Sequence, residues 1–441
     1  MKVASRIVVG VLCIIVLLIG WFVVVNAKSE EEKQNELVDE AVALMDQNIL
    51  IRAQPLLEEA IAYDGPRSGE AEELLKKIYV TFLDERGYRR KYLALLEEEM
   101  GRKEPEPTVF IEAGNYYLDA SKLTQAIITF KNGYEQTGDM ELKDLYESNR
   151  YAYHSNYLRH YYDDVTVFYN GAIQVCLDGK WGLANTDGSI LIDCQYDKIS
   201  TYYNNTAIVC QNGEIFTVDS SGHRLYVAPV PVDDFINLAS DRTALLAEEG
   251  WIRANSILTI GNAVYEELCM AEGGYAAAKC NGKWGVINLQ GEWVVPAEYE
   301  GVVRNELGGC CYVNGAGEES SLLVFVNRDG NTFLLKDNQQ LPQAYEDARP
   351  FAGGYAAVKM HGKWGFIDAD GIIQIPCTYE DALSFDSQVA AVRIDGLWGY
   401  ISCDGEMVIE AQFEQAKSFQ NGIAPVLLDN GWTFISLYEY E

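Results

Sequence analysis

A Trp-Gly pair recurs along the second half of the chain, and this recurrence constrains the fold more than any other feature. The four complete pairs are Trp181-Gly182, Trp284-Gly285, Trp364-Gly365 and Trp398-Gly399. In each unit an aromatic residue follows 15 residues after the tryptophan, namely Tyr196, Tyr299, Tyr379 and Phe413. Degenerate copies place Ile215, Trp251, Leu323 and Trp432 at the tryptophan position. The eight positions are 33 to 41 residues apart, which indicates a repeat protein.

Each unit is predicted to be an antiparallel meander of three short strands. In the clearest unit these strands cover residues 355–360, 364–368 and 372–375. His361-Gly362 separates the first two strands and Asp370-Gly371 the next two. Both pairs suit tight turns that need positive φ.

The second strand carries apolar side chains on both of its faces, so neighbouring units must cover each other face to face. The number of units and a period of about 40 residues favour a closed β-propeller, with an open β-solenoid as the alternative. We expect the glycine beside each tryptophan to leave room for an aromatic ring of the neighbouring unit. The last unit lacks a third strand, and residues 165–169 are expected to complete it and close the ring.

These units resemble the WG-repeat (KWG-type) β-repeat proteins of bacteria across residues 163–441. The resemblance implies a β-repeat interaction domain, because that family mostly lacks an assigned activity. The eight anchor residues of the four complete pairs are therefore expected to be structural and not to bind a ligand.

Residues 28–160 are predicted to be helical, because apolar residues recur there at helical spacing. Residues 110–153 resemble the helical hairpins of tetratricopeptide-type repeats, with small residues where paired helices approach and aromatic residues between them. Generic helix packing is the alternative. The apolar residues that carry this resemblance are Ala113, Tyr116, Tyr117, Leu118, Ala126, Ile127, Phe130, Tyr134, Leu142, Leu145 and Tyr146.

Residues 7–25 contain no charged side chain and are long enough to cross a membrane as one helix. Lys2 and Arg6 precede this run and Glu30 follows it, which favours a single-pass signal anchor with the rest of the chain outside the cytoplasm, in a bacterial cell envelope. A cleaved signal peptide ending at Ala27 is the alternative. The expected architecture is α+β and multidomain: a transmembrane anchor (1–27), a helical domain (28–160) and a β-repeat domain (161–441).

The charge of the chain excludes one class of partner. Residues 161–441 contain 15 basic and 39 acidic side chains, which is about three-quarters of the net charge of -32. A surface this acidic repels phosphate backbones, so no nucleic-acid binding is expected. Nine of the ten cysteines also lie in this half and include no CxxC motif. We expect these cysteines to be small buried hydrophobic residues and not disulfides or zinc ligands.

No catalytic motif is present, and neither an enzymatic activity nor a cofactor is expected. The four histidines, His154, His160, His223 and His361, lie in sequence contexts typical of surface residues. Asp368 and Asp370 precede Gly371 with the alternate spacing of calcium ligands, but Asp-Gly is also the usual hairpin turn, and the turn interpretation is favoured.

The predicted function is a membrane-anchored extracytoplasmic scaffold that docks a protein partner. The alternative is a carbohydrate-binding module at the cell wall that uses exposed Tyr and Trp side chains. A propeller-fold enzyme such as a glycosidase is the least favoured function, because no carboxylate pair stands out in so acidic a chain.

Overall fold

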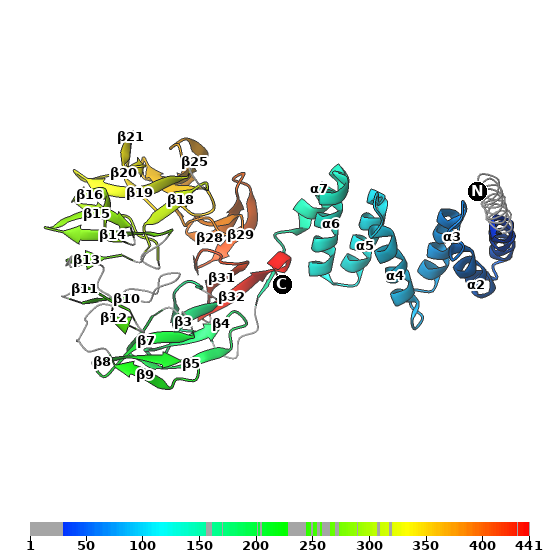
Figure 1. The fold of residues 1–441 in the computed structure, drawn as a ribbon, viewed down its shortest axis with the longest axis horizontal. Helices are drawn as coiled ribbons and strands as arrows, with labels where there is room; N and C mark the ends of the chain where they lie inside the picture. Colours follow the sequence, from blue (N-terminus) through cyan, green and yellow to red (C-terminus); the bar gives the residue numbers. More distant parts are fainter. Residues whose placement is uncertain are drawn as a thin grey trace, which may run out of the picture. The chain divides into compact units, whose positions relative to one another are not determined.

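The computed structural model describes residues 30–440, apart from residues 156–160, 170, 201, 203–204, 228–243, 248–249, 254–255, 258–264, 270–272, 289, 307–308, 317–319 and 430. The chain divides into two compact units, Met1–Ser148 and Asn149–Glu441. The first unit is helical and the second consists almost entirely of β-sheet (Figure 1).

The helical unit is a series of short helices in which each one from α2 to α6 contacts the next. Residues 30–46 are also helical. The helices are α2 (Leu50–Ile61), α3 (Ser68–Thr81), α4 (Tyr88–Met100), α5 (Pro107–Asp119), α6 (Leu123–Thr137) and α7 (Met140–Asn149). The core along the first five of these helical segments contains Val38, Leu57, Ile78 and Leu96, which are all fully buried.

Helices α5 and α6 approach closely because each has a glycine opposite an aromatic ring. A Cβ atom on Gly114 would overlap the ring of Phe130, and one on Gly133 would overlap the side chain of Phe110. Gly114 and Gly133 are therefore small residues of the kind that the sequence predicted where paired helices approach.

The predicted fold class is wrong in its single transmembrane helix. Every helix in the described part of the chain is too short or too polar to cross a membrane. Residues 7–25, on which the membrane anchor was predicted, lie outside the described residues. The corrected class is α+β, with a helical unit followed by an all-β repeat unit. The extracytoplasmic location stays a prediction.

The described residues of the β unit form eight antiparallel sheets, here called blades and numbered along the chain. Blade 1 contains β2 (Asp164–Val165), β3 (Ala172–Leu177), β4 (Lys180–Asn185) and β5 (Ile190–Tyr196), and blade 2 contains β6 (Lys198–Ile199), β7 (Thr206–Gln211), β8 (Glu214–Asp219) and β9 (Arg224–Val227). Blade 3 contains β10 (Ala244–Ala247), β11 (Gly250–Arg253) and β12 (Ser256–Ile257). Blade 4 contains β13 (Glu267–Leu268), β14 (Tyr275–Cys280), β15 (Lys283–Asn288) and β16 (Trp293–Tyr299).

Blade 5 contains β17 (Gly301–Val302), β18 (Cys311–Asn314), β19 (Ser321–Arg328), β20 (Asn331–Lys336) and β21 (Gln339–Tyr345). Blade 6 contains β22 (Asp347–Ala348), β23 (Ala356–Met360), β24 (Lys363–Ile367) and β25 (Ile373–Tyr379), and blade 7 contains β26 (Asp381–Ala382), β27 (Val389–Ile394), β28 (Leu397–Ser402) and β29 (Met407–Phe413). Blade 8 contains β30 (Gln415–Ala416), β31 (Ile423–Leu428), β32 (Gly431–Leu437) and β1 (Tyr153–Ser155).

A typical blade has four strands, one more than the sequence had suggested. The additional strand has two residues, as in β26, and directly follows the closing Tyr-Glu pair of the preceding unit. So short a strand has no hydrophobic periodicity of its own, which explains why the pattern did not reveal it. The last strands of the blades, such as β9, β16, β21 and β25, lie at the outside of the ring (Figure 1).

Blade 5 departs from the predicted register. Its five strands include the insertion β18, and Leu323 lies in β19 and not in the strand equivalent to β24. Thr332 on β20 pairs with Tyr345, as Trp364 on β24 pairs with Tyr379. Thr332 is therefore the residue at the tryptophan position, and the assignment of Leu323 was wrong because the insertion shifts the repeat.

The array closes into a propeller-like ring, because blade 8 is completed from the N-terminal side of the unit. Strand β1 pairs with β32, so residues 153–155 supply the closing strand and not residues 165–169. The backbones of Tyr162 and Trp432 also exchange two hydrogen bonds of 3.0 and 3.2 Å. Trp432 of blade 8 packs with Val165 and Ile173 of blade 1, so the first and last blades share an interface.

Candidate functional site

The repeated tryptophans lie in the interfaces between blades. Trp364 is 4 % exposed and pairs across the sheet with Tyr379, the aromatic residue 15 positions later. It also packs in one apolar cluster with Phe385 and Ile401 of blade 7. Trp284 and Trp398 are likewise buried, whereas Trp181 is half-buried. The regular spacing of tryptophan and aromatic thus reflects a cross-strand pair inside an interface.

We expect Trp364→Ala to lower the free energy of unfolding by about 3–5 kcal/mol, because it empties a buried aromatic site. Chemical denaturation followed by Trp and Tyr fluorescence measures this loss. A variant that keeps the wild-type midpoint but loses a binding partner would instead place Trp364 in a binding site.

The glycine of each Trp-Gly pair faces backbone of its own blade, so the expectation that it accommodates a neighbouring aromatic ring was wrong. An added Cβ on Gly365 would lie 2.6 Å from the carbonyl oxygen of Ile375 and from the amide nitrogen of Cys377. Gly182, Gly285 and Gly399 have equivalent backbone neighbours. The outer strand bulges opposite each glycine, as the register shifts between β24 and β25 show, and its backbone occupies the space of a side chain.

The acidic residue after a closing aromatic links successive blades at Glu266, Glu346 and Glu380. The carboxylate of Glu346 accepts a hydrogen bond of 3.0 Å from the backbone N–H of Gly362, in the first hairpin turn of the next blade. Glu380 and Glu266 bind Gly396 and Gly282 in the same way. The spacing of tryptophan and aromatic residues in the sequence did not predict this role. The fixed distance of 16 residues between this acid and a turn glycine is the signal that could have revealed it.

The cysteines of the β unit are all free thiols in the structure. Cys269, Cys310 and Cys311 are buried together, and the sulfur atoms of Cys310 and Cys311 are 3.5 Å apart. The hydrogen bond with Cys310, together with burial, raises the pKa of the Cys269 thiol, so this thiol stays protonated and packs as a small apolar side chain.

Within the described residues, His154, His223 and His361 do not form a shared site. His223 is exposed and lies 3.3 Å from Asp219 within one hairpin turn, and His361 occupies a turn with φ of 53°. His154 packs against the ring of Tyr438, and His160 lies outside the described residues.

The carboxylates of the calcium candidate bind protein donors. Oδ1 of Asp368 accepts hydrogen bonds from the backbone N–H groups of Asp370 and Ile372, and Oδ2 accepts one from Gln374. Asp370 forms an ion pair of 2.6 Å with Lys336. Within the described ranges no three His, Cys, Asp or Glu side chains are grouped as metal ligands. Asp368 therefore has the role of a turn-stabilising residue.

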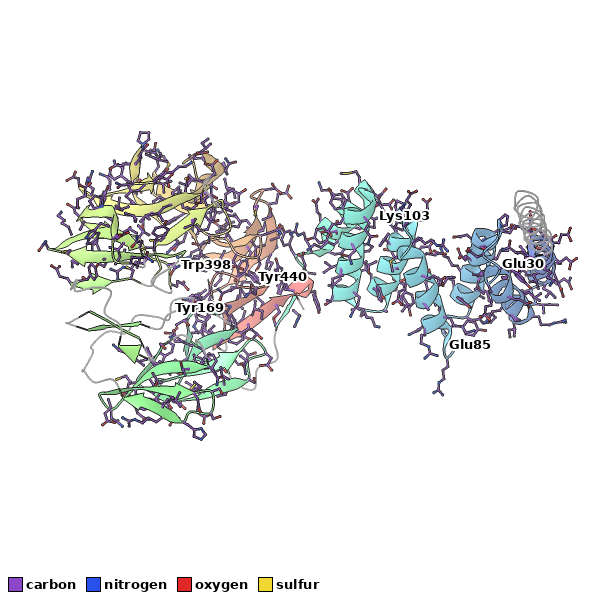
Figure 2. All side chains as sticks on the ribbon, in the orientation of Figure 1. Glu30, Glu85, Lys103, Tyr169, Trp398 and Tyr440 are labelled. Carbon is purple, nitrogen blue, oxygen red and sulfur yellow. The ribbon has the colours of Figure 1, made fainter. Side chains whose placement is uncertain are left out.

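A cavity of about 340 Å³ lies where the inner loops of five blades meet. It is lined by residues 167–169, 304–306, 349–352, 383–386 and 418–420, each of which follows the short first strand of its blade. Blades 1 and 5 are on opposite sides of a ring of eight, so this axial cavity spans the ring axis. Tyr169 lies toward the centre of the ring (Figure 2).

The loops around the axial cavity combine a repeated framework with a variable position. Four of them place a buried phenylalanine at the same point: Phe168, Phe351, Phe385 and Phe419. The next residue closes a tight turn by bridging to the residue three positions later, and here the side chain differs from loop to loop: Tyr169, Ala352, Asp386 and Gln420. The repeat thus fixes the backbone and leaves this side chain free to vary.

Asp386 is a half-buried acid of these loops. Burial raises its pKa, although Ser387 Oγ and the backbone N–H of Asn421 donate hydrogen bonds to its Oδ1 at 2.6 and 3.2 Å.

Because folding raises the pKa of Asp386, its ionisation lowers the free energy of unfolding. This loss of stability is present at neutral pH and disappears at a pH where Asp386 is protonated in both the folded and the unfolded state. Asp386→Asn keeps the acceptor oxygen and should raise the melting temperature at pH 7, with the gain vanishing below about pH 4, the usual range of an Asp. Thermal denaturation at both pH values checks this. Equal gains at pH 7 and pH 4 would show that ionisation of Asp386 is not the cause.

A family model for the WG containing repeat matches residues 159–181, 181–214, 284–310, 342–364, 364–398 and 398–432. These six stretches support a β-repeat protein of the WG type in the second half of the chain. Each complete Trp-Gly pair stands at the start of one of these matches, and the matches do not extend into the helical unit. The resemblance of that unit to tetratricopeptide repeats is therefore not confirmed.

The solved structures to which the chain is similar have low sequence identity to it. PorZ, a bacterial surface component of the type-IX secretion system of Porphyromonas gingivalis, is 14% identical with a TM-score of 0.32 over 62% of this chain and 42% of that chain. Apo AztD from Citrobacter koseri is 14% identical with a TM-score of 0.29, over 62% of this chain and 94% of that one. The dihydro-heme d1 dehydrogenase NirN is 13% identical with a TM-score of 0.42, over 59% of this chain and 68% of that chain.

The chain spans less than half the length of PorZ. Similarity at this level does not assign a function. Comparison with curated protein sequences finds no match.

Proposed function

We propose that this chain is a non-enzymatic scaffold that docks a partner protein on the loop face of the WG-repeat ring. The loop face is the surface formed by residues 167–169, 304–306, 349–352, 383–386 and 418–420 around the axial cavity. The observation that carries the proposal is the variable residue after each repeated phenylalanine, because a rigid repeat framework that presents different side chains on one concave face is typical of recognition surfaces.

The turns of the loop face are held rigidly, which favours docking without a large entropic cost. The carbonyl and N–H of Asp386 both bond to Val389, and those of Gln420 both bond to Ile423. Adjacent loops are also joined, since Ser387 Oγ accepts a hydrogen bond of 2.8 Å from the backbone N–H of Gly422.

Affinity capture with matched variants tests this function. The double variant Tyr169→Ala, Glu306→Ala alters the loop face. The control Ile373→Ala, Glu410→Ala removes one large side chain and one acid from outer strands, where both residues are exposed. We expect a protein captured by the wild-type chain and by the control to be lost from the loop-face variant, with all three melting alike. Retention by the loop-face variant, or equal loss from the control, contradicts the proposal.

A glycan-binding site is the second candidate, favoured by one exposed aromatic side chain. Trp293 is 40 % exposed and borders a groove of about 360 Å³ with Asn281, Lys283 and Pro296. Its ring contacts Tyr265 edge-on at 5.9 Å, which leaves a face on which a sugar can stack. On a glycan array, binding that disappears with Trp293→Ala and persists with Tyr169→Ala would favour this function over protein docking.

A further inference from the structure

Two arginines on adjacent blades line the axial cavity in an otherwise acidic domain. Arg304 follows the first strand of blade 5 and Arg349 follows that of blade 6. Both guanidinium groups stack on the tryptophan of their interface, with Cζ of Arg304 4.5 Å from the ring centre of Trp284 and Cζ of Arg349 4.8 Å from that of Trp364. Stacking on buried rings restricts both side chains before any ligand arrives.

Each arginine also contacts one carboxylate of a neighbouring blade. Arg349 donates from Nε to the carbonyl oxygen of Ala382 at 2.6 Å and from Nη2 to Asp381 at 2.9 Å. Arg304 Nη2 lies 3.5 Å from Glu267. A guanidinium has five N–H donors, so these bonds orient the groups and use only part of their capacity.

The acids that line the axial cavity are partly compensated. Glu306 forms an ion pair of 3.4 Å with Lys417, which reaches it from blade 8. Asp386 accepts hydrogen bonds from Ser387 and Asn421. Repulsion of a bound anion by these two groups is therefore reduced.

We propose that the axial cavity binds a small aromatic carboxylate, with the carboxylate at Arg304 and Arg349 and the ring among the aromatic side chains of the inner loops. The volume of about 340 Å³ is near the lower limit of small-molecule pockets, which suits a ligand of one ring and a short chain. Planar arginine forks match a carboxylate. Because Glu267 and Asp381 already neutralise part of the arginine charge, a monoanion fits better than a phosphate dianion. This site depends on the cavity and not on the proposed protein partner.

Isothermal titration calorimetry on the full chain tests the inference with 3-phenylpropionate, its neutral amide and inorganic phosphate as probes. We expect the carboxylate to bind, and Arg304→Gln to weaken it roughly tenfold, as for the loss of one charge-assisted hydrogen bond. Asp386→Asn should strengthen binding by about threefold, because it removes a nearby negative charge.

Arg328→Gln is the matched control, because Arg328 stacks on Tyr299 at 4.6 Å and pairs with Glu298 at 2.8 Å but does not line the axial cavity. The affinity of the Arg328→Gln variant for 3-phenylpropionate should equal that of the wild type. Absence of carboxylate binding overturns the inference, as does equal binding of the amide, equal weakening by Arg328→Gln, or tighter binding of phosphate. Melting curves of Arg304→Gln and Arg304→Lys confirm folding, and partial recovery of affinity with lysine is expected.

Discussion

Gly365→Ala is expected to destabilise the WG-repeat ring by about 3 kcal/mol, the upper end of the cost of overpacking a core. The added methyl group would lie 2.6 Å from the backbone of Ile375 and Cys377, and backbone cannot move aside as a flexible side chain can. The outer strand β25 would have to shift away from β24, which would disturb the ladder between Trp364 and Tyr379. Urea denaturation of the purified chain measures the loss.

Gly362→Ala in the same blade is the matched control. Gly362 lies in a hairpin turn with φ of 76°, and an added Cβ there meets no atom within 4 Å. Its cost is therefore only the strain of a left-handed backbone, about 1–2 kcal/mol. Similar losses in the two variants would show that backbone conformation, and not the approach of β25, explains the glycine of the Trp-Gly pair.

Deletion of residues 422–441 is expected to unfold the entire WG-repeat domain in one transition. The deletion removes β31 and β32, so β1 loses its only neighbour in the sheet order. It also removes Trp432 and Phe434 from the apolar cluster shared with blade 1. In addition, it exposes the face of blade 7 that packs against blade 8. Opening a ring exposes two interfaces at once, whereas shortening a linear array exposes one.

Hydrogen exchange on the truncated chain reads out this cooperativity. Loss of protection should extend to blades 3 to 6, far from the deletion in the sequence. A control truncation after Leu437 keeps β32 and removes only the final turn Tyr438–Tyr440 and Glu441, so protection of the ring should remain. Loss of protection confined to blades 7 and 8 would indicate that the units behave as a linear array despite their closed topology.

The repeat length, the number of units and the position of the main strands followed from the sequence alone. A strand such as β24 has apolar side chains on both faces within five residues, and the hairpin at His361-Gly362 needs positive φ at both positions, which the structure has at 53° and 76°. Such signals are local, so they can be detected without knowing what packs against the strand.

The roles of the anchor residues were only partly predictable. The buried, structural character of Trp364 follows from its recurrence, but its neighbours come from blade 7. The glycine beside it was assigned to the wrong contact because the bulge in β25 that approaches it has no distinct sequence pattern. Thr332 was missed because a threonine at the tryptophan position leaves no motif to align.

The sequence by itself determined that this chain contains a helical region followed by eight β units, because periodic hydrophobicity and turn glycines act over a few residues. Only the tertiary structure decided which strand closes the ring. The closing strand β1 has three residues and lies more than 270 positions before β32, so neither its length nor its composition indicates its partner. The axial cavity, too, was decided only by the tertiary structure. Each of its five loops has an ordinary sequence, and their side chains form a site because closure of the ring brings them around one axis.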